Sequence, residues 1–217
     1  MKNIKITIVA FTAIFFATTS VQAQAVEEGN ILVDVYAGYG TAFNALFRTA
    51  YQGLDTDSKL SSIDAIGVRA EYLFADKFGV GVDITYSSIK IVDPYSSFAY
   101  TYDGSGNITG STTKTYEQTT SSRKIGVMAT MNYHFLNNDK IDAYTNLGVG
   151  YKNRSYKYES TDPTNASATT IGVGTLLPLA LRVGVGMRYF FTDNFGLNMN
   201  VGLGQGGWVN GGVSLKF

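Results

Sequence analysis

The stretch Phe195-Gly-Leu-Asn-Met-Asn-Val-Gly-Leu203 decides the fold. Its odd-numbered residues are all large and apolar, whereas its even-numbered residues are all Gly or Asn. Successive side chains of a β-strand point to opposite faces, so this stretch predicts a strand with one apolar face and one small or polar face. It also has about the 9–11 residues that a tilted strand needs to cross a bilayer.

The same alternation recurs along the chain, most clearly in residues 66–74, 78–86, 125–135 and 181–191. We therefore predict strands near residues 31–40, 62–74, 78–92, 119–135, 140–156, 174–191, 194–204 and 208–217. Apart from a short last one, the connections alternate between long and short, which places long loops at one end and tight turns at the other. The predicted fold is all-β, an eight-stranded antiparallel up-and-down transmembrane β-barrel.

Nearly the same aromatic phrase occurs twice, as Tyr72-Leu-Phe-Ala-Asp-Lys-Phe-Gly-Val80 and as Tyr189-Phe-Phe-Thr-Asp-Asn-Phe-Gly-Leu197. Each copy joins two predicted strands, so we interpret it as the tight turn of a hairpin. Rings that point outward at the strand ends would lie at the level of the lipid headgroups. The aromatic girdle predicted at this end consists of Tyr72, Phe74, Phe78, Tyr133, Phe135, Tyr189, Phe191 and Phe195.

A second set of outward aromatic residues is predicted at the opposite end, namely Tyr39, Tyr86 and Tyr151. With a strand rise near 3.4 Å and a tilt of about 40°, the two levels are roughly 21 Å apart. This spacing is close to the apolar band of about 25 Å on membrane barrels.

The first 25 residues have the features of a secretory signal peptide. Lys2 and Lys5 precede an apolar run over residues 6–17, and small residues follow for cleavage after Ala23 or Ala25. A transmembrane anchor is the alternative, but the run is shorter than the roughly 20 residues that a spanning helix needs. We therefore expect residues 1–25 to be a signal peptide and residues 26–217 to form the barrel domain.

Composition excludes several classes of function. The chain has no Cys, which removes disulfides, thiolate metal sites, a Cys nucleophile and a lipoprotein anchor. Its 17 Lys and Arg residues balance 17 Asp and Glu residues, which argues against nucleic acid as a partner. No cofactor or metal site is predicted. A soluble barrel of the lipocalin type is an alternative, but the polar face here is dominated by Gly, Asn, Ser and Thr and lacks the charged residues of a soluble surface.

The chain ends in Gly212-Val-Ser-Leu-Lys-Phe217, in which Val213, Leu215 and Phe217 share the outward phase. This segment resembles the terminal strand signal that directs bacterial outer-membrane proteins to barrel insertion. With the signal peptide and the aromatic turns, it makes the chain similar to the small, porin-like, eight-stranded barrels of the OmpA transmembrane domain, OmpX and OmpW kind. The resemblance implies a multi-pass protein of the bacterial outer membrane, expected to be a monomer. The implied partners are outer-membrane lipid, lipopolysaccharide and the barrel-assembly machinery.

The inward phase carries four acidic and four basic residues: Asp34, Glu71, Asp83 and Asp142 against Arg69, Lys152, Arg182 and Arg188. A ring of one sign would indicate ion selectivity, whereas balanced charges favour ion pairs that fill a narrow lumen. The many inward glycines leave a second interpretation open, because they could accommodate large side chains or leave a water path. The only histidine, His134, has the inward phase at the tight-turn end, away from an outer-leaflet catalytic site. We therefore expect a hydrogen-bonded lumen residue there, and no enzyme.

The remaining candidate functional segments are in the long connections between the strands. Residues 93–120 are rich in Tyr, Ser and Thr and predict a hairpin beyond the membrane, and the apolar loop 41–60 could fold over the barrel mouth. Pro178 with Leu176, Leu177, Leu179 and Leu181 could border a lateral opening. The sequence therefore predicts an outer-membrane structural or surface-interaction protein with a charge-plugged lumen. The alternatives are a narrow channel for small or hydrophobic solutes and, more distantly, a lipid-modifying enzyme.

Overall fold

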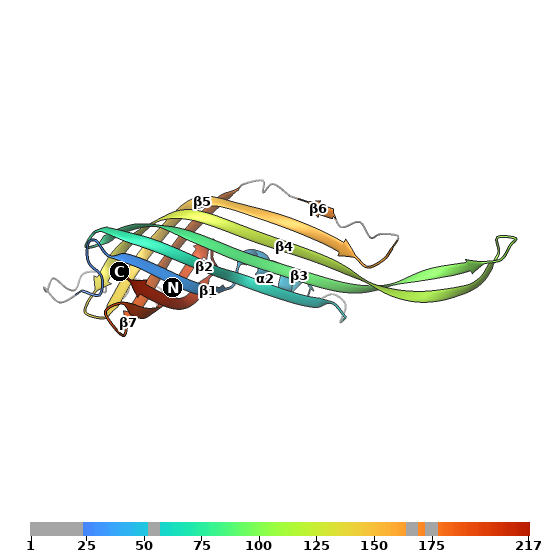
Figure 1. Cartoon of the computed structure of the whole chain (residues 1–217), viewed down its shortest axis with the longest axis horizontal. Coiled ribbons are helices and arrows are strands. Elements are labelled where there is room, and N and C mark those ends of the chain that lie inside the picture. The colour runs from blue at the N-terminus through green and yellow to red at the C-terminus, as the bar shows by residue number, and fades with distance from the viewer. Residues whose placement is uncertain (1–23, 52–56, 164–168, 172–177) are drawn as a thin grey trace, which may run out of the picture.

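The structure, a computed structural model, describes residues 24–51, 57–163, 169–171 and 178–217 (Figure 1). Its elements follow one another as β1 (Ile31–Tyr39), α2 (Ala42–Tyr51), β2 (Lys59–Ala75), β3 (Phe78–Tyr102), β4 (Ile108–Asn137), β5 (Ile141–Ser160), β6 (Thr169–Ile171), β7 (Leu179–Phe190), β8 (Phe195–Gly204) and β9 (Val209–Lys216). The predicted signal peptide lies outside the described residues, apart from Gln24 and Ala25. Within the described ranges, no helix is long and apolar enough to span a bilayer.

Eight of the described strands form a closed ring in which every neighbouring pair is antiparallel. The order around the ring is β1, β2, β3, β4, β5, β7, β8 and β9, and β9 pairs back with β1. A closed ring gives each barrel strand two hydrogen-bonded neighbours, which a spanning sheet needs because lipid cannot satisfy a free edge. The prediction of an eight-stranded up-and-down barrel is confirmed.

The barrel wall has an apolar outside and a polar inside. Along β8, Phe195, Met199 and Leu203 are 43%, 52% and 67% exposed, whereas Asn200 between them is buried. Residues at i and i+2 share a face of a strand, so each barrel strand contributes a row of exposed apolar side chains. Exposing apolar surface to water costs about 25 cal/mol per Å². This outer face is therefore suited to the hydrocarbon of a bilayer and not to the water around a soluble barrel.

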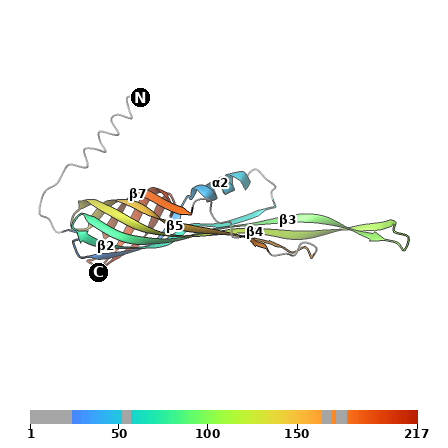
Figure 2. The same cartoon turned by 90° about the horizontal axis from the view of Figure 1, so that it is seen from above.

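The two ends of the barrel differ. At the short-turn end, residues 76–77, 138–140 and 191–194 join the strand pairs, and the C-terminus lies at this end as well (Figure 2). At the long-loop end lie α2, the β3–β4 hairpin and the described parts of the connection between β5 and β7. β3 and β4 continue far beyond the barrel as a two-stranded ribbon (Figure 1).

The ribbon is the hairpin beyond the membrane that was predicted for residues 93–120, and it continues β3 and β4 past the ends predicted for the spanning strands. They stay paired as far as Tyr102 and Ile108, because Thr, Tyr and Phe favour a strand even where no apolar alternation remains. At the tip, the backbone N–H of Asn107 donates to Asp103 Oδ1 at 2.8 Å. This hydrogen bond is the main reason why the pKa of the Asp103 carboxyl is lowered from its ordinary value.

The connection 41–60, predicted as a loop, contains the helix α2. Thr41 caps its first turn, since the backbone N–H of Asn44 donates to Thr41 Oγ1 at 3.3 Å. Asp64 on β2 anchors the helix, because Asp64 Oδ1 accepts hydrogen bonds from Asn44 Nδ2 at 3.0 Å and from Arg48 Nη2 at 3.1 Å. The helix is thereby fixed to the rim at the long-loop end (Figure 2).

Within the described residues the sixth barrel strand, β7, begins at Leu179, and residues 174–177, where its start was predicted, lie outside them. Pro178 directly precedes it, which fits a residue that cannot donate to a central ladder. Leu176 and Leu177 of the proposed lateral opening lie outside the described residues. The short strand β6 instead pairs with β5 at Tyr156 and Tyr158, beyond the barrel.

Candidate functional site

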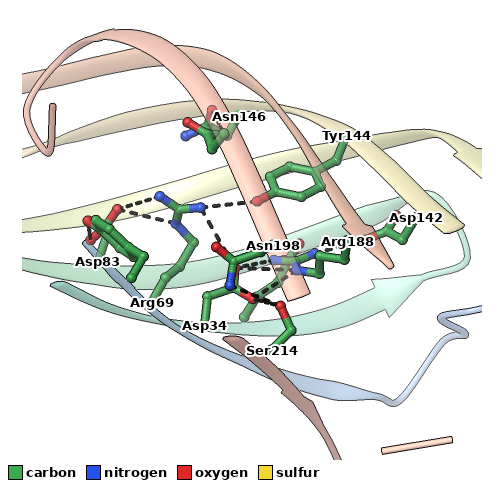
Figure 3. Close-up of polar contacts among 12 residues, drawn as sticks. Asp34, Arg69, Asp83, Asp142, Tyr144, Asn146, Arg188, Asn198 and Ser214 are labelled. Atoms are coloured by element: carbon green, nitrogen blue, oxygen red, sulfur yellow. Dashed lines mark hydrogen bonds and ion pairs between the residues drawn. The ribbon is translucent and has the colours of Figure 1, made fainter. Parts of the chain in front are cut away.

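Arg188 on β7 is the centre of a buried ion-pair network in the lumen (Figure 3). Its guanidinium donates to Asp34 Oδ2 on β1, to Glu71 Oε2 on β2 and to Asp142 Oδ2 on β5, each at 2.8 Å. The guanidinium also lies 4.2 Å from the centre of the Tyr144 ring. The Arg188 side chain is fully buried. This one residue connects three carboxylates across the interior.

Arg69 extends the network toward the long-loop end (Figure 3). Its Nη2 donates to Asp83 Oδ2 at 2.8 Å, and its Nη1 donates to the Tyr144 hydroxyl at 3.2 Å. The other oxygen of Asp83 accepts a hydrogen bond from the Tyr36 hydroxyl at 2.6 Å. Arg69 Nη1 is 3.8 Å from Asp34 Oδ2, which connects this pair to the Arg188 group.

His134, predicted as a hydrogen-bonded lumen residue but not as a member of the charge network, belongs to the same network. Its Nδ1 lies 2.6 Å from Asp142 Oδ1, and its Nε2 lies 2.9 Å from Glu71 Oε1. An ionised carboxylate only accepts hydrogen bonds, so both contacts are satisfied when the ring is a doubly protonated imidazolium. The available signal was its inward phase on β4, next to the strand that carries Asp142. Neither this group nor any other His, Asp or Glu cluster in the described residues has the arrangement of a metal site.

Arg182 and Lys152, also predicted in the lumen network, lie outside it. Arg182 Nη1 donates to the backbone carbonyls of Gln205 and of Gly207, the latter at 3.1 Å, and its Nη2 donates to Asn200. These contacts connect β7 to β8 and to the β8–β9 turn. Lys152 has no ion pair among the described residues, so the prediction that it pairs in the network needs correction: it lines a cavity at the long-loop end instead.

The inward glycines near the network make room for neighbouring side chains. A Cβ atom on Gly186 would collide with the ring of Tyr144, and one on Gly79 would collide with the Glu71 carboxylate. At these two positions the space left by the glycine is therefore filled by a side chain from the next strand. This favours the interpretation that the inward glycines accommodate large side chains over the one that they leave a water path.

A layer of apolar side chains closes the short-turn end, formed by Ala25, Val26, Leu32, Leu73 and Phe190. Hydrogen bonds hold the N-terminal segment in this layer. The backbone N–H of Ala25 donates to the Asn138 carbonyl at 2.7 Å, and Lys216 Nζ donates to the Ala25 carbonyl at 2.8 Å. Asn137 Nδ2 donates to the Val26 carbonyl at 2.6 Å.

The long-loop end is more open. A cavity of about 500 Å³ is lined there by Lys124, Lys152 and Arg154. A groove of about 650 Å³ runs over apolar residues of the outer wall, including Met131 and Val149. Both are bounded by Leu181 and Gly204, so the cavity and the groove adjoin at this part of the wall.

The predicted girdle residues lie on the outer wall near the short turns. Phe78 contacts Tyr133 with ring centres 5.2 Å apart, and Tyr189 contacts Phe191 at 5.1 Å. Phe135 lies at a register shift between β4 and β5 and is only half exposed. The remaining members, Tyr72, Phe74 and Phe195, are exposed. Of the predicted insertion signal, Leu215 on β9 and the terminal Phe217 after it are exposed, and Val213 on β9 is half-buried.

No protein-family model matches the chain, and no curated protein matches it. Among solved structures, the chain is similar to the N-terminal β-barrel domain of OprF from Pseudomonas aeruginosa (11% identity, 88% of this chain and 100% of that chain covered, TM-score 0.39). It is similar to Ail, the attachment invasion locus protein of Yersinia pestis (12% identity, 88% of this chain and 99% of that chain covered, TM-score 0.40). It is also similar to the outer membrane protein OprG from Pseudomonas aeruginosa (12% identity, 91% of this chain and 99% of that chain covered, TM-score 0.44).

The class of protein follows from the chain's own geometry. A closed ring of eight antiparallel strands has an apolar outer face, a charged and buried interior, short turns at one end and long connections at the other. These features define an integral membrane β-barrel of the bacterial outer-membrane type. In such barrels the short-turn end faces the periplasm and the long-loop end faces the exterior.

Proposed function

We propose that this barrel is a structural and surface-interaction protein of the outer membrane, that its lumen is closed to ions and that it is not an enzyme. The observation that carries the proposal is Arg188, fully buried and bonded to carboxylates from three other strands. Moving any of these charges apart to let an ion pass would leave an uncompensated buried charge, which is costly. The apolar layer at the short-turn end supports the same conclusion.

The ribbon of β3 and β4 is the proposed interaction surface. One of its faces carries Phe98, Tyr100 and Tyr102, which are 62%, 52% and 60% exposed. Exposed aromatic residues are unusual on a solvated surface and enriched where proteins bind partners. We place lipopolysaccharide and outer-membrane lipid among the partners of the barrel wall, and the barrel-assembly machinery among its partners during insertion.

Single-channel recording tests the closed lumen. The mature protein, refolded into a planar bilayer and checked for folding by heat-dependent gel mobility, should produce no discrete conductance steps. Protease cleavage of the exposed ribbon would verify that the silent protein is inserted. Reproducible steps from folded protein would contradict the proposal.

A narrow channel for small or hydrophobic solutes is the second candidate. It is favoured by the cavity at the long-loop end, which adjoins the apolar groove on the wall at Leu181 and Gly204. Such a path would let an apolar solute leave sideways into lipid without passing the Arg188 network. Uptake of an apolar dye into proteoliposomes, with no ion conductance, would support this candidate.

The division into a signal peptide and a barrel domain is also a proposal, and the apolar layer refines it. Ala25 donates and accepts backbone hydrogen bonds within that layer, so cleavage after Ala23 keeps these contacts and cleavage after Ala25 removes them. We therefore expect protein purified from membranes to begin at Gln24, as measured by intact mass. A mass that corresponds to Val26 as the first residue would refute this expectation.

A further inference from the structure

Three cationic side chains meet at the long-loop end of the lumen. Lys124 on β4 and Arg154 on β5 are directly opposite each other in the strand register, and Lys152 is two residues from Arg154 on the same face. All three have the inward phase, since the adjacent Ile125 and Tyr151 are outward and exposed. Arg154 Nη1 donates to Ser122 Oγ at 3.2 Å.

This cluster differs from the Arg188 network in its charge balance. The ion pairs of the described residues include neither Lys124 nor Lys152. Like charges directly opposite on neighbouring strands destabilise a sheet, and both lysines are half-buried, which weakens screening by water. An anion between these side chains would remove the repulsion.

The three side chains line one cavity of about 500 Å³. Its wall also offers hydrogen-bonding groups from Thr41, Tyr156 and Gln205. This volume lies within the range of cavities that hold small ligands. Guanidinium and ammonium groups form strong charge-assisted hydrogen bonds to phosphate oxygens, and hydroxyl and amide groups can complete the shell.

We propose that this cavity binds a phosphate group. The phosphate could be free in solution or carried on a lipid headgroup, in which case the adjoining groove along Met131, Leu147 and Val149 would lie beside the acyl chains. This site is independent of the closed lumen proposed above, because it lies on the outer side of the Arg188 network. Its failure would leave that proposal unaffected.

The test uses refolded mature protein and a pair of matched double variants. Lys124→Gln with Lys152→Gln removes the two unpaired lysines of the cavity, whereas Arg123→Gln with Lys157→Gln removes exposed cations from the same two strands. Binding is measured by calorimetry with inorganic phosphate in neutral detergent. It is measured again by the ³¹P NMR linewidth of phosphatidic acid in phosphatidylcholine nanodiscs. Heat-dependent gel mobility verifies folding of each variant.

Wild type and the Arg123/Lys157 variant should bind equally, and the Lys124/Lys152 variant should bind at least about tenfold more weakly, which corresponds to about 1.4 kcal/mol. Binding of inorganic phosphate in detergent would assign the site to a soluble anion, and binding of phosphatidic acid alone would assign it to a headgroup. The proposal is overturned if neither probe binds, or if both double variants lose affinity equally.

Stability provides a second readout, measured without the calorimetric or NMR signal. Without phosphate, the Lys124/Lys152 variant should unfold at the same or a higher urea concentration than wild type, because repulsion is relieved. Added phosphate should raise the midpoint of wild type and not of the variant, since a ligand stabilises only the state that binds it. Equal shifts in both proteins would overturn the proposal.

Discussion

Replacing Arg188 with Met is expected to lower the free energy of unfolding of the barrel by about 3–5 kcal/mol, the cost of removing one partner from a buried ion pair. Asp34, Glu71 and Asp142 would keep their negative charges in a space from which water is excluded. Among the described residues, His134 and Arg69 alone would remain to compensate three carboxylates. Urea titration of protein in lipid vesicles, followed by the fluorescence of the single residue Trp208 and by gel mobility, measures the loss.

Two further variants separate the network from a general effect of lost charge. Arg123→Met removes an exposed arginine from β4 and should change stability by less than about 0.5 kcal/mol. Arg188→Lys should recover only part of the loss, because an ammonium group cannot reproduce the planar fork that bonds several carboxylates at once. A loss below about 1 kcal/mol for Arg188→Met would show that the network contributes little to stability.

The strands were predictable because the membrane imposes a pattern on them. Wherever one face of a strand contacts lipid and the other faces the lumen, apolar and polar residues must alternate. This alternation predicted the bounds of β7, β8 and β9 to within a few residues at nearly every described end. Outside the bilayer this constraint ends. The ribbon was predicted there only as a hairpin of Tyr, Ser and Thr residues, not as a continuation of β3 and β4, and α2 forms where only an apolar loop was expected.

The lumen was predictable in its residues but not in its pairs. Phase alone placed Asp34 and Arg188 inside, yet they are 154 residues apart and meet only because the ring closes with one particular stagger. Lys152 has the inward phase too, but its height on β5 places it opposite Gly126, beyond the network. Height depends on the register between strands, and the alternation of one strand carries no information about it.

The apolar layer at the short-turn end was not predicted. Ala25 and Val26 lie at the junction between the export signal and the first strand, and small residues there were attributed to cleavage. Their burial against Leu73 and Phe190 is a tertiary contact between segments far apart in the sequence. No periodic pattern accompanies such a contact, so only the structure reveals it.

Placing an arginine on the lipid-facing wall should have the second large effect. Val82 on β3 points outward, is 46% exposed and lies four residues from both Phe78 and Tyr86, which mark the two aromatic levels. At this depth Val82→Arg should lower the free energy of unfolding in vesicles by about 2–4 kcal/mol, because a charge near the bilayer midplane loses its hydration.

The matched variant is Ile125→Arg, which is also outward but lies opposite Tyr86 at the outer aromatic level. Near the interface an arginine side chain reaches water, so the expected loss is only about 0–1 kcal/mol. The two variants share the new residue, the outward phase and a β-branched apolar residue as the one replaced, and the difference that matters between them is depth. Equal losses would contradict the position of the membrane between the two aromatic levels, whereas a large loss at Val82 with a small one at Ile125 would locate the bilayer midplane on β3.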